Sequence, residues 1–450
     1  MRLTVLHIIS DTKKKVIANI IWALIGKIVS LTGALLVGIL VARYLGPENY
    51  GIMNYVISYV AIFSVISYFG LDDIEIRELS KDNSNKNQIL GTCFCIRITF
   101  ASVAFLLIIA TLYIYQANRF TTYMILIYSS TLFFECFNII RNYFYSIVKN
   151  KYVVKTSIVR TIIGALIKIL LLYLKAPLYL FIIATAFDYL LIANGYILSY
   201  INKVGKISKW CYNRSLSVYV VKEAFPLFLS AVAIVIYQRV DQIMIANMID
   251  NKSLGYYSSA GRFLDLIMYL PLVITQTLTP LLIRAKESNH IEYKKKKIQY
   301  VSLIVWTSIV LALFFSICSI WLIKYTFGEK YLMAIPILQI LAWKTVGMAM
   351  STTSGQIIIM EGVQKLAVLR NIVGCAICIS LNYIIIPIYG ILGVAWVAVI
   401  TVFFSGFIAN LIIPTFKDVF FIQCHALLYG WKELCNIKQL IEKNDDKRKT

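Results

Sequence analysis

About a dozen long apolar stretches fill most of this chain, and several of them contain charged residues. A bilayer core about 30 Å thick requires about 20 apolar residues for each helix that crosses it. The 450 residues are 60% hydrophobic and only 15% charged, with a mean hydropathy of +0.76. This composition excludes a disordered chain and is too apolar for an ordinary soluble enzyme. The sequence therefore predicts an all-α polytopic membrane protein.

Twelve membrane-spanning helices are predicted from the lengths of these stretches. The first six lie near residues 18–42, 50–70, 89–115, 120–146, 153–174 and 178–201, and the second six near 223–249, 254–283, 299–323, 332–359, 366–388 and 391–413. The polar stretch at 202–222 is the longest internal break. It predicts an N-terminal six-helix lobe at 1–201, a cytoplasmic linker at 202–222, a C-terminal six-helix lobe at 223–413 and a cytoplasmic tail at 414–450.

The basic residues indicate the orientation. A net charge of +22 would favour a nucleic acid partner in a soluble protein, but here Lys and Arg lie mainly between the apolar stretches. With the N-terminus inside, the cytoplasmic segments carry 30 of these residues and the opposite loops carry 6. We therefore expect both termini in the cytoplasm and no nucleic acid partner. The first apolar stretch is too long for a cleavable signal peptide, so it is expected to stay as a helix.

The cysteines and histidines predict neither disulfides nor a metal site. Most of the nine cysteines fall inside apolar stretches, and the three histidines are far apart in the sequence. Cys375 and Cys378 form a CxxC pair, but it lies on an apolar helix without partner ligands. No metal and no cofactor is expected.

The C-terminal tail contains a helical pattern. Its apolar residues recur with helical spacing at Leu427, Leu428, Trp431, Leu434 and Cys435. This pattern fits an amphipathic helix on the inner membrane surface, and it fits a solvated helical tail nearly as well.

A weak internal repeat relates the two predicted lobes. The letters ILVA at 39–42, followed by Gly51, match IMIA at 243–246, followed by Gly255. Both matches have an offset of 204 residues, and each falls where the first helix of a lobe ends and the second begins. Because both copies start from the same side, the repeat is expected to be parallel, with its axis along the membrane normal.

Several motifs resemble those of one transporter family. The stretch GILVARYLGPENYG at 38–51 resembles the first-helix signature of the bacterial polysaccharide flippases, which belong to the multidrug/oligosaccharidyl-lipid/polysaccharide exporter superfamily. The letters FGLD at 69–72 and IREL at 76–79 resemble the family's second-helix ending. The letters YQRVDQIM at 237–244, with LGYY at 254–257, resemble the family's seventh-helix pattern.

The resemblance implies a fold and a function. Two six-helix lobes would enclose a central cavity that opens alternately to each side of the bacterial inner membrane. The cargo would be an undecaprenyl-diphosphate-linked oligosaccharide, moved for assembly of O-antigen or capsule. Membrane lipid and a polysaccharide polymerase would then be the expected partners.

Charges inside the predicted spans point to an anionic cargo. Eight cations lie there against four acids. A set of purely structural ion pairs would balance, whereas a surplus of Arg and Lys suits a diphosphate, which Arg binds bidentately. Arg262 and Asp265 are spaced to pair locally. The other cations are the predicted cargo-binding residues: Lys27, Arg97, Arg141, Arg160, Lys168, Arg239 and Lys344.

Three parts of the predicted spans have alternative interpretations. Arg160, Gly164 and Lys168 share one helix face without an acid nearby in the sequence, which favours an anion path over snorkelling of Arg160 to the interface. Lys27 lies beside a face of small residues that would admit a headgroup or another backbone, or it pairs with a distant carboxylate. The hydroxyl-rich run at 351–356 predicts either a wet wall or hydroxyls bonded to their own helix.

Four carboxylates are candidates for ion coupling or for structural hydrogen bonds: Glu135, Asp188, Asp241 and Asp265. A carboxylate surrounded by hydrocarbon favours its protonated form, so H⁺ is a candidate coupling ion beside Na⁺.

Rival functions are less favoured by the sequence. A membrane glycosyltransferase or polymerase would need acidic catalytic motifs or a large outside loop, and neither is visible, so no enzyme is expected. An ion-coupled antiporter of drugs or organic cations would favour acids over cations in its cavity. A flippase of another lipid-linked precursor stays open, and the sequence does not identify the sugar.

Overall fold

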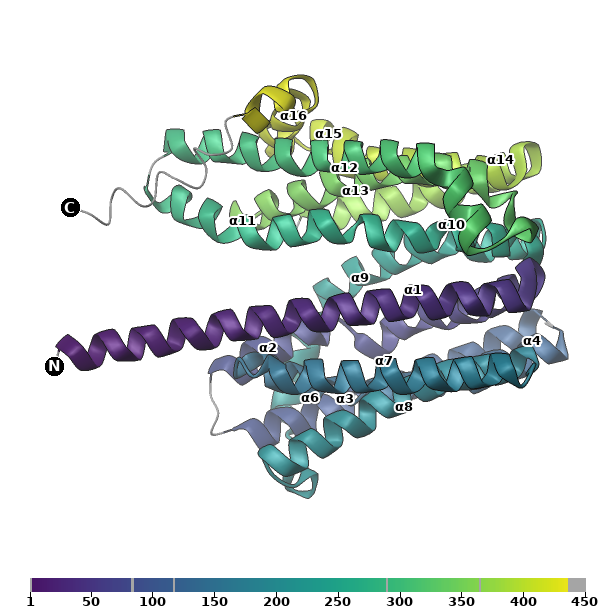
Figure 1. Cartoon of the computed structure of the whole chain (residues 1–450). Coiled ribbons are helices and arrows are strands. Elements are labelled where there is room, and N and C mark those ends of the chain that lie inside the picture. Colours follow the sequence, from purple (N-terminus) through teal and green to yellow (C-terminus); the bar gives the residue numbers. More distant parts are fainter. Residues whose placement is uncertain (1, 82–84, 116–117, 289, 364–365, 436–450) are drawn as a thin grey trace. The chain divides into compact units, whose positions relative to one another are not determined.

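The computed structural model describes residues 2–81, 85–115, 118–288, 290–363 and 366–435, and all regular structure in these ranges is helical (Figure 1). The α-helices are α1 (Arg2–Tyr68), α2 (Leu71–Lys81), α3 (Lys86–Tyr115), α4 (Arg119–Ser129), α5 (Thr131–Glu135), α6 (Asn138–Ser146), α7 (Asn150–Tyr173), α8 (Leu178–Lys203), α9 (Arg214–Met248), α10 (Asn251–Ile267), α11 (Tyr269–Ser288), α12 (His290–Thr326), α13 (Ala334–Met360), α14 (Ala367–Phe403), α15 (Ala409–Ile412) and α16 (Lys417–Cys435). Short 3₁₀ or π turns lie at Ile207–Lys209, Glu329–Tyr331, Phe404–Ile408 and Pro414–Phe416. The all-α membrane fold expected from the sequence is confirmed.

Two of the longest helices each contain a reversal of the chain. Ten segments of the described chain are long and apolar enough to cross a membrane, and two of them, Thr32–Lys81 and Val368–Ile412, are about twice the usual length. Gly46 has φ 75° and Gly390 has φ 55°, values that glycine adopts without a Cβ clash. Counting the two halves of each segment separately gives the predicted twelve spans.

The chain forms two compact units, Met1–Leu45 with Ile52–Val235, and Gly46–Gly51 with Ile236–Thr450. The division falls inside α9, beyond the polar stretch at 202–222. The reason is that the first turns of α9 pack in the first unit, where Val220 and Ala224 are fully buried.

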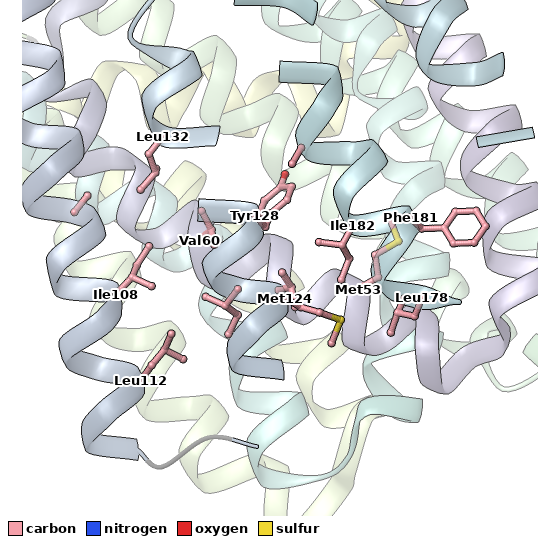
Figure 2. Packing of buried hydrophobic residues seen from close by; sticks show 14 of the residues in the cluster. Met53, Val60, Ile108, Leu112, Met124, Tyr128, Leu132, Leu178, Phe181 and Ile182 are labelled. Carbon is pink, nitrogen blue, oxygen red and sulfur yellow. The ribbon is translucent and has the colours of Figure 1, made fainter. Parts of the chain in front are cut away.

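The first unit has two apolar clusters. One lies between α1, α3, α4 and α8, where Met53, Met124 and Ile182 meet (Figure 2). The other surrounds Phe69 at the turn from α1 to α2, and its ring stacks on Phe100 with 4.0 Å between centroids. These contacts fix the start of α2, which carries two of the acids described below.

In the second unit, α12 packs against α13 and α16. The tail helix α16 buries Val419, Ile422 and Ala426 in the same apolar cluster as α12 and α13. The Trp306 indole N–H donates to the Ala426 carbonyl at 2.9 Å. The tail helix is therefore attached to the protein by one face, while Trp431 is exposed. The side chains of the last two residues in the predicted pattern, 434 and 435, lie outside the described residues.

The repeat detected in the sequence corresponds to a reciprocal backbone contact within the second unit. A Cβ on Gly51 would lie 1.7 Å from the Asn251 carbonyl oxygen, and a Cβ on Gly255 would lie 1.9 Å from the Pro47 carbonyl oxygen. Pro47 and Asn251 have the same offset in sequence as the two glycines. Each copy of the repeat thus places its glycine against the matching loop of the other copy, which supports a parallel repeat.

We expect Gly51→Ala and Gly255→Ala to destabilise the protein by about 1–3 kcal/mol or more, because an added methyl group would meet rigid backbone. Thermal unfolding of the purified protein in detergent measures this. Gly261→Ala is the matched control on the same helix, because nothing lies within 4 Å of its Cβ position. Equal melting of Gly255→Ala and Gly261→Ala would contradict the close contact.

A second expectation concerns Glu361, which follows α13. It accepts a hydrogen bond from the Tyr293 hydroxyl at 2.8 Å and pairs with Lys297 and Lys286 at 3.3 and 3.5 Å. Burial alone would raise the pKa of Glu361, but the Tyr293 hydrogen bond and the two positive charges lower it below its ordinary value of 4.5. The stabilisation is thus present above that value and is lost as the pH falls through the lowered pKa.

We therefore expect the wild-type melting temperature to fall more steeply below about pH 5 than that of Glu361→Gln, which lacks this titration. Melting curves between neutral and acidic pH provide the measurement. The exposed Glu287 serves as the control position, and Glu287→Gln should follow the wild type. Parallel curves for wild type and Glu361→Gln would rule out the ion pairs.

Candidate functional site

The most enclosed cation in the described part of the first unit is Arg97 on α3. Its guanidinium donates to both oxygens of Glu75, at 2.7 and 2.8 Å, and also to Asp72. Arg97 is 1% exposed and Glu75 is fully buried. The turn at Phe69 and Gly70 starts α2 here, so that Asp72 and Glu75 lie on one face of that helix.

A second arginine completes this arrangement, which we call the Asp72 cluster (Asp72, Glu75, Arg97, Arg141 and Asn142). Arg141 on α6 donates to Asp72 at 2.9 Å. The Asn142 amide donates to Asp72 at 2.8 Å and to Glu75 at 2.6 Å. Two arginines thus face two carboxylates, as a buried ionic group requires.

The Asp72 cluster changes the interpretation of two predicted cargo-binding residues. The sequence count of intramembrane charges omitted Asp72 and Glu75, because they follow the predicted end of the second span. Arg97 is enclosed by these carboxylates and has no donor face open to a ligand. Arg141 is also paired, but its side chain keeps 26% of its surface exposed.

Glu135 lies next to this cluster, at the end of the short helix α5. The segment Arg119–Ser146 is interrupted at Ser130 and again at Cys136 and Phe137, where the amides bond three residues back instead of four. Glu135 accepts a hydrogen bond from the Tyr68 hydroxyl, and Arg97 and Arg141 act on it through space. An interrupted helix beside a carboxylate is typical of sites in membrane transporters.

The predicted stripe on α7 contains an ion pair that its spacing does not reveal. Lys168 donates to Asp188 on α8 at 2.6 Å. Gly164 makes room for this carboxylate, since a Cβ there would lie 2.0 Å from Asp188 Oδ1. The sequence interpretation favoured an anion path because no acid is near this stripe in the sequence, and the structure supplies one from 20 residues away. Arg160, one turn beyond Gly164, has a buried Nε without a hydrogen-bond partner.

Lys27 lies in α1, but its side chain is outside the described residues. The small face next to it packs against α7. Ser30 Oγ lies 3.5 Å from Thr161 Oγ1, and a Cβ on Gly33 would lie 2.6 Å from the Thr161 methyl group. The sequence left a headgroup or another backbone as the neighbour of this face. In the structure the neighbour is the helix α7.

The second unit buries a group that we call the Asp241 cluster (Asp241, Tyr257, Cys378, Asn382 and Thr401). Asp241 is 2% exposed and accepts a hydrogen bond from the Tyr257 hydroxyl. On α14, the Asn382 amide donates to Cys378, which lies beside Asp241 and Thr401. Asn382 Oδ1 has no partner.

Three further charges of the second unit lie in its spans. Arg239 on α9 and Lys344 on α13 are half-buried. Neither has an ion pair in the part of the chain that the structure describes. Arg262 donates to the Tyr50 hydroxyl at 3.0 Å, while Asp265 is exposed. The contact between Arg262 and Tyr50 joins residues 212 positions apart, so spacing along one helix does not predict it.

Arg370 is a buried cation that the sequence interpretation missed. It lies in the first turn of α14, is 6% exposed, and donates to Ser354 Oγ at 2.7 Å, while its Nε has no partner. The sequence assigned it to a cytoplasmic helix end. Ser354 belongs to the hydroxyl-rich run, whose Thr352, Thr353 and Ser354 also bond to carbonyls of their own helix. The signal available in the sequence was an arginine near the start of the helix that follows this hydroxyl-rich run.

Within the described residues, no group of three or more His, Cys, Asp or Glu side chains is arranged to hold a metal ion. The helical spans define a multi-pass membrane protein. The chain belongs to the polysaccharide biosynthesis protein family, whose model matches residues 16–286. A search of the curated proteins found no match.

Solved structures show the same fold. The lipid II flippase MurJ in an inward closed conformation has a TM-score of 0.67 and 16% identity, with 92% of each chain covered. An inward-facing multidrug resistance MATE family transporter of the MOP superfamily has a TM-score of 0.66 and 14% identity, covering 89% of this chain and 96% of the other. The Vibrio cholerae MATE transporter VcmN has a TM-score of 0.59 and 13% identity, covering 93% of this chain and 97% of the other. The chain thus has a flippase-type transporter fold.

We expect Glu75→Gln to lower the stability of the protein by about 3–5 kcal/mol, because it breaks a buried ion pair and leaves the charge of Arg97 undercompensated. Thermal unfolding in detergent is the measurement. Arg77→Gln is the control, since Arg77 pairs with Glu78 and Glu223 at the surface, where removal costs about 1 kcal/mol or less. If both variants melt alike, the Asp72 cluster is not the buried group described here.

Proposed function

We propose that the protein is a flippase that moves an undecaprenyl-diphosphate-linked oligosaccharide across the bacterial inner membrane by alternating access, for O-antigen or capsule assembly. Both termini would lie in the cytoplasm, as the distribution of Lys and Arg favours. A polysaccharide polymerase that takes over the translocated unit is the proposed partner.

The observation that carries this proposal is a pair of cations deep in the spanning helices without an ion pair in the described chain, Arg239 and Lys344. A cation at the centre of a spanning helix costs about 2.5–3.5 kcal/mol on insertion scales. Pairing explains Arg97, Arg141 and Lys168, and it does not explain these two. An anionic cargo would offset their cost, and the diphosphate of a lipid-linked sugar has the charge and oxygen geometry that Arg and Lys bind.

Carboxylates of both units supply candidates for ion coupling by H⁺ or Na⁺. Glu135 accepts a hydrogen bond from the Tyr68 hydroxyl and lies at a helix interruption. Asp241 is buried and accepts hydrogen bonds from the Tyr257 hydroxyl and the Gln242 amide, and Asn382 Oδ1, which has no partner among the described residues, belongs to the same cluster. Glu135 and Asp241 are therefore the proposed coupling carboxylates, whereas Asp188 is already held by Lys168.

An ion-coupled antiporter of organic cations is the second candidate. The MATE-type fold and the carboxylate of Glu135 favour it. A flippase of another lipid-linked precursor is the third, supported by the likeness to a lipid II flippase. The unpaired cations favour either flippase over the antiporter.

Transport of a fluorescent undecaprenyl-diphosphate oligosaccharide in proteoliposomes tests the proposal. We expect Arg239→Gln and Lys344→Gln each to lower the rate about tenfold or more, since each removes a charged hydrogen bond to the diphosphate. Lys252→Gln, at an exposed position in the first turn of α10, should transport like the wild type. Melting temperatures confirm that the variants are folded.

Two outcomes would contradict the flippase. One is full transport by folded Arg239→Gln and Lys344→Gln. The other is no movement of any lipid-linked sugar together with H⁺- or Na⁺-driven efflux of an organic cation, which would establish the antiporter instead.

A further inference from the structure

We infer that a pocket between α7 and α8 is a binding site for the phosphate headgroup of an anionic phospholipid. The pocket lies within the first unit and has a volume of about 520 Å³. It is lined by Lys151, Tyr152, Lys155, Thr156, Val159 and Arg160 from α7, and by Leu191, Gly195, Leu198, Ser199, Asn202 and Lys203 from α8. This inference does not depend on the proposed transport function.

The charge of the pocket is entirely positive. Its described lining contains four cations and no acid. The closest paired carboxylate along α8, Asp188, is held by Lys168 two turns beyond Arg160. A multiply charged anion is the ligand that this lining suits, and hydroxyl and amide groups of Thr156, Ser199 and Asn202 add hydrogen-bonding groups around it.

Arg160 indicates what kind of anion is bound. Its Nε is buried and has no hydrogen-bond partner among the residues that the structure describes. A buried guanidinium donor without an acceptor is costly, and a phosphate with several oxygens satisfies it in the bidentate geometry that Arg prefers. Lys155 and Lys203 are exposed, so they can reach the same phosphate from either helix.

The floor of the pocket is rigid. A Cβ on Gly195 would lie 2.4 Å from the Thr156 methyl group, so α7 and α8 pack closely beneath the cations. A ligand therefore rests on the groove between two helices and does not have to separate them.

The surface that continues from the pocket indicates a lipid as the source of the phosphate. Five apolar residues follow Lys155 along one face of α7 at spacings of three or four, and all are exposed: Val159, Ile162, Leu166, Leu170 and Tyr173. From Lys155 to Tyr173 this face is about 27 Å long, close to the thickness of a bilayer core. The cations thus lie at headgroup level and the apolar face runs alongside the acyl chains. A soluble anion would use the cations but leave the apolar face unexplained.

Native mass spectrometry of the full chain, delipidated and then titrated with lipid, tests this site. Phosphatidylglycerol should bind the wild type, and phosphatidylcholine should bind much more weakly. We expect the apparent Kd for phosphatidylglycerol to rise about tenfold in Arg160→Gln and in Lys203→Gln, because each removes a charged hydrogen bond. Lys209→Gln, an exposed cation outside the pocket, should leave the Kd unchanged.

Lys203→Gln keeps the test decisive if Arg160→Gln does not fold, because Lys203 is at the surface. Equal phosphatidylglycerol binding by wild type and Lys203→Gln would overturn the inference. So would complete displacement of the lipid by millimolar inorganic phosphate, which would identify a site for a free anion. Displacement by a much lower concentration of undecaprenyl phosphate would assign the pocket to a polyprenyl cargo and also overturn the phospholipid site.

Discussion

The cost of placing a charge in hydrocarbon determines much of this structure. Such a charge is retained when a partner compensates it, and a carboxylate from a neighbouring helix is the partner that the protein itself can supply. Arg97 receives two carboxylates from α2, and Lys168 receives one from α8. The helices that carry these groups are thereby held in register. The same rule separates the structural cations from those whose partner must come from outside the chain.

Small residues make these pairings sterically possible. Gly70 adopts φ 66°, so the chain can turn and begin α2 with Asp72 facing Arg97. Gly164 leaves the space that Asp188 occupies beside Lys168. The same property at Gly51 and Gly255 lets two backbone segments of the repeat touch. Charge compensation and close backbone approach are therefore linked, since an added side chain at any of these glycines would displace a group that the fold requires.

The number and limits of the spans could be predicted from the sequence, because a bilayer imposes a minimum apolar length on every crossing. The partners of the charges could not. Asp72 and Glu75 lie just beyond an apolar stretch, so counting charges inside stretches overlooked them. Asp188 is 20 residues from Lys168 and meets it only when α7 and α8 pack. Arg370 looked like a helix-end residue, and it is buried because α13 covers it at Ser354. Each omission concerns a contact between helices, which periodicity along one helix does not contain.

Cations without an ion pair in the described chain lie at two depths, and the anion that can compensate them differs between the two. At headgroup level, where the α7–α8 pocket opens, lipid phosphates are always present, so Arg160 can be satisfied at equilibrium without any cargo. Deeper in the helices no resident anion is available, and Arg239 and Lys344 keep their positive charges without a carboxylate. Under the proposed function, a charge of this second kind would be compensated only while an anion passes. It would lower the barrier for a diphosphate without holding a permanent ligand, which is what a carrier that must also release its cargo requires.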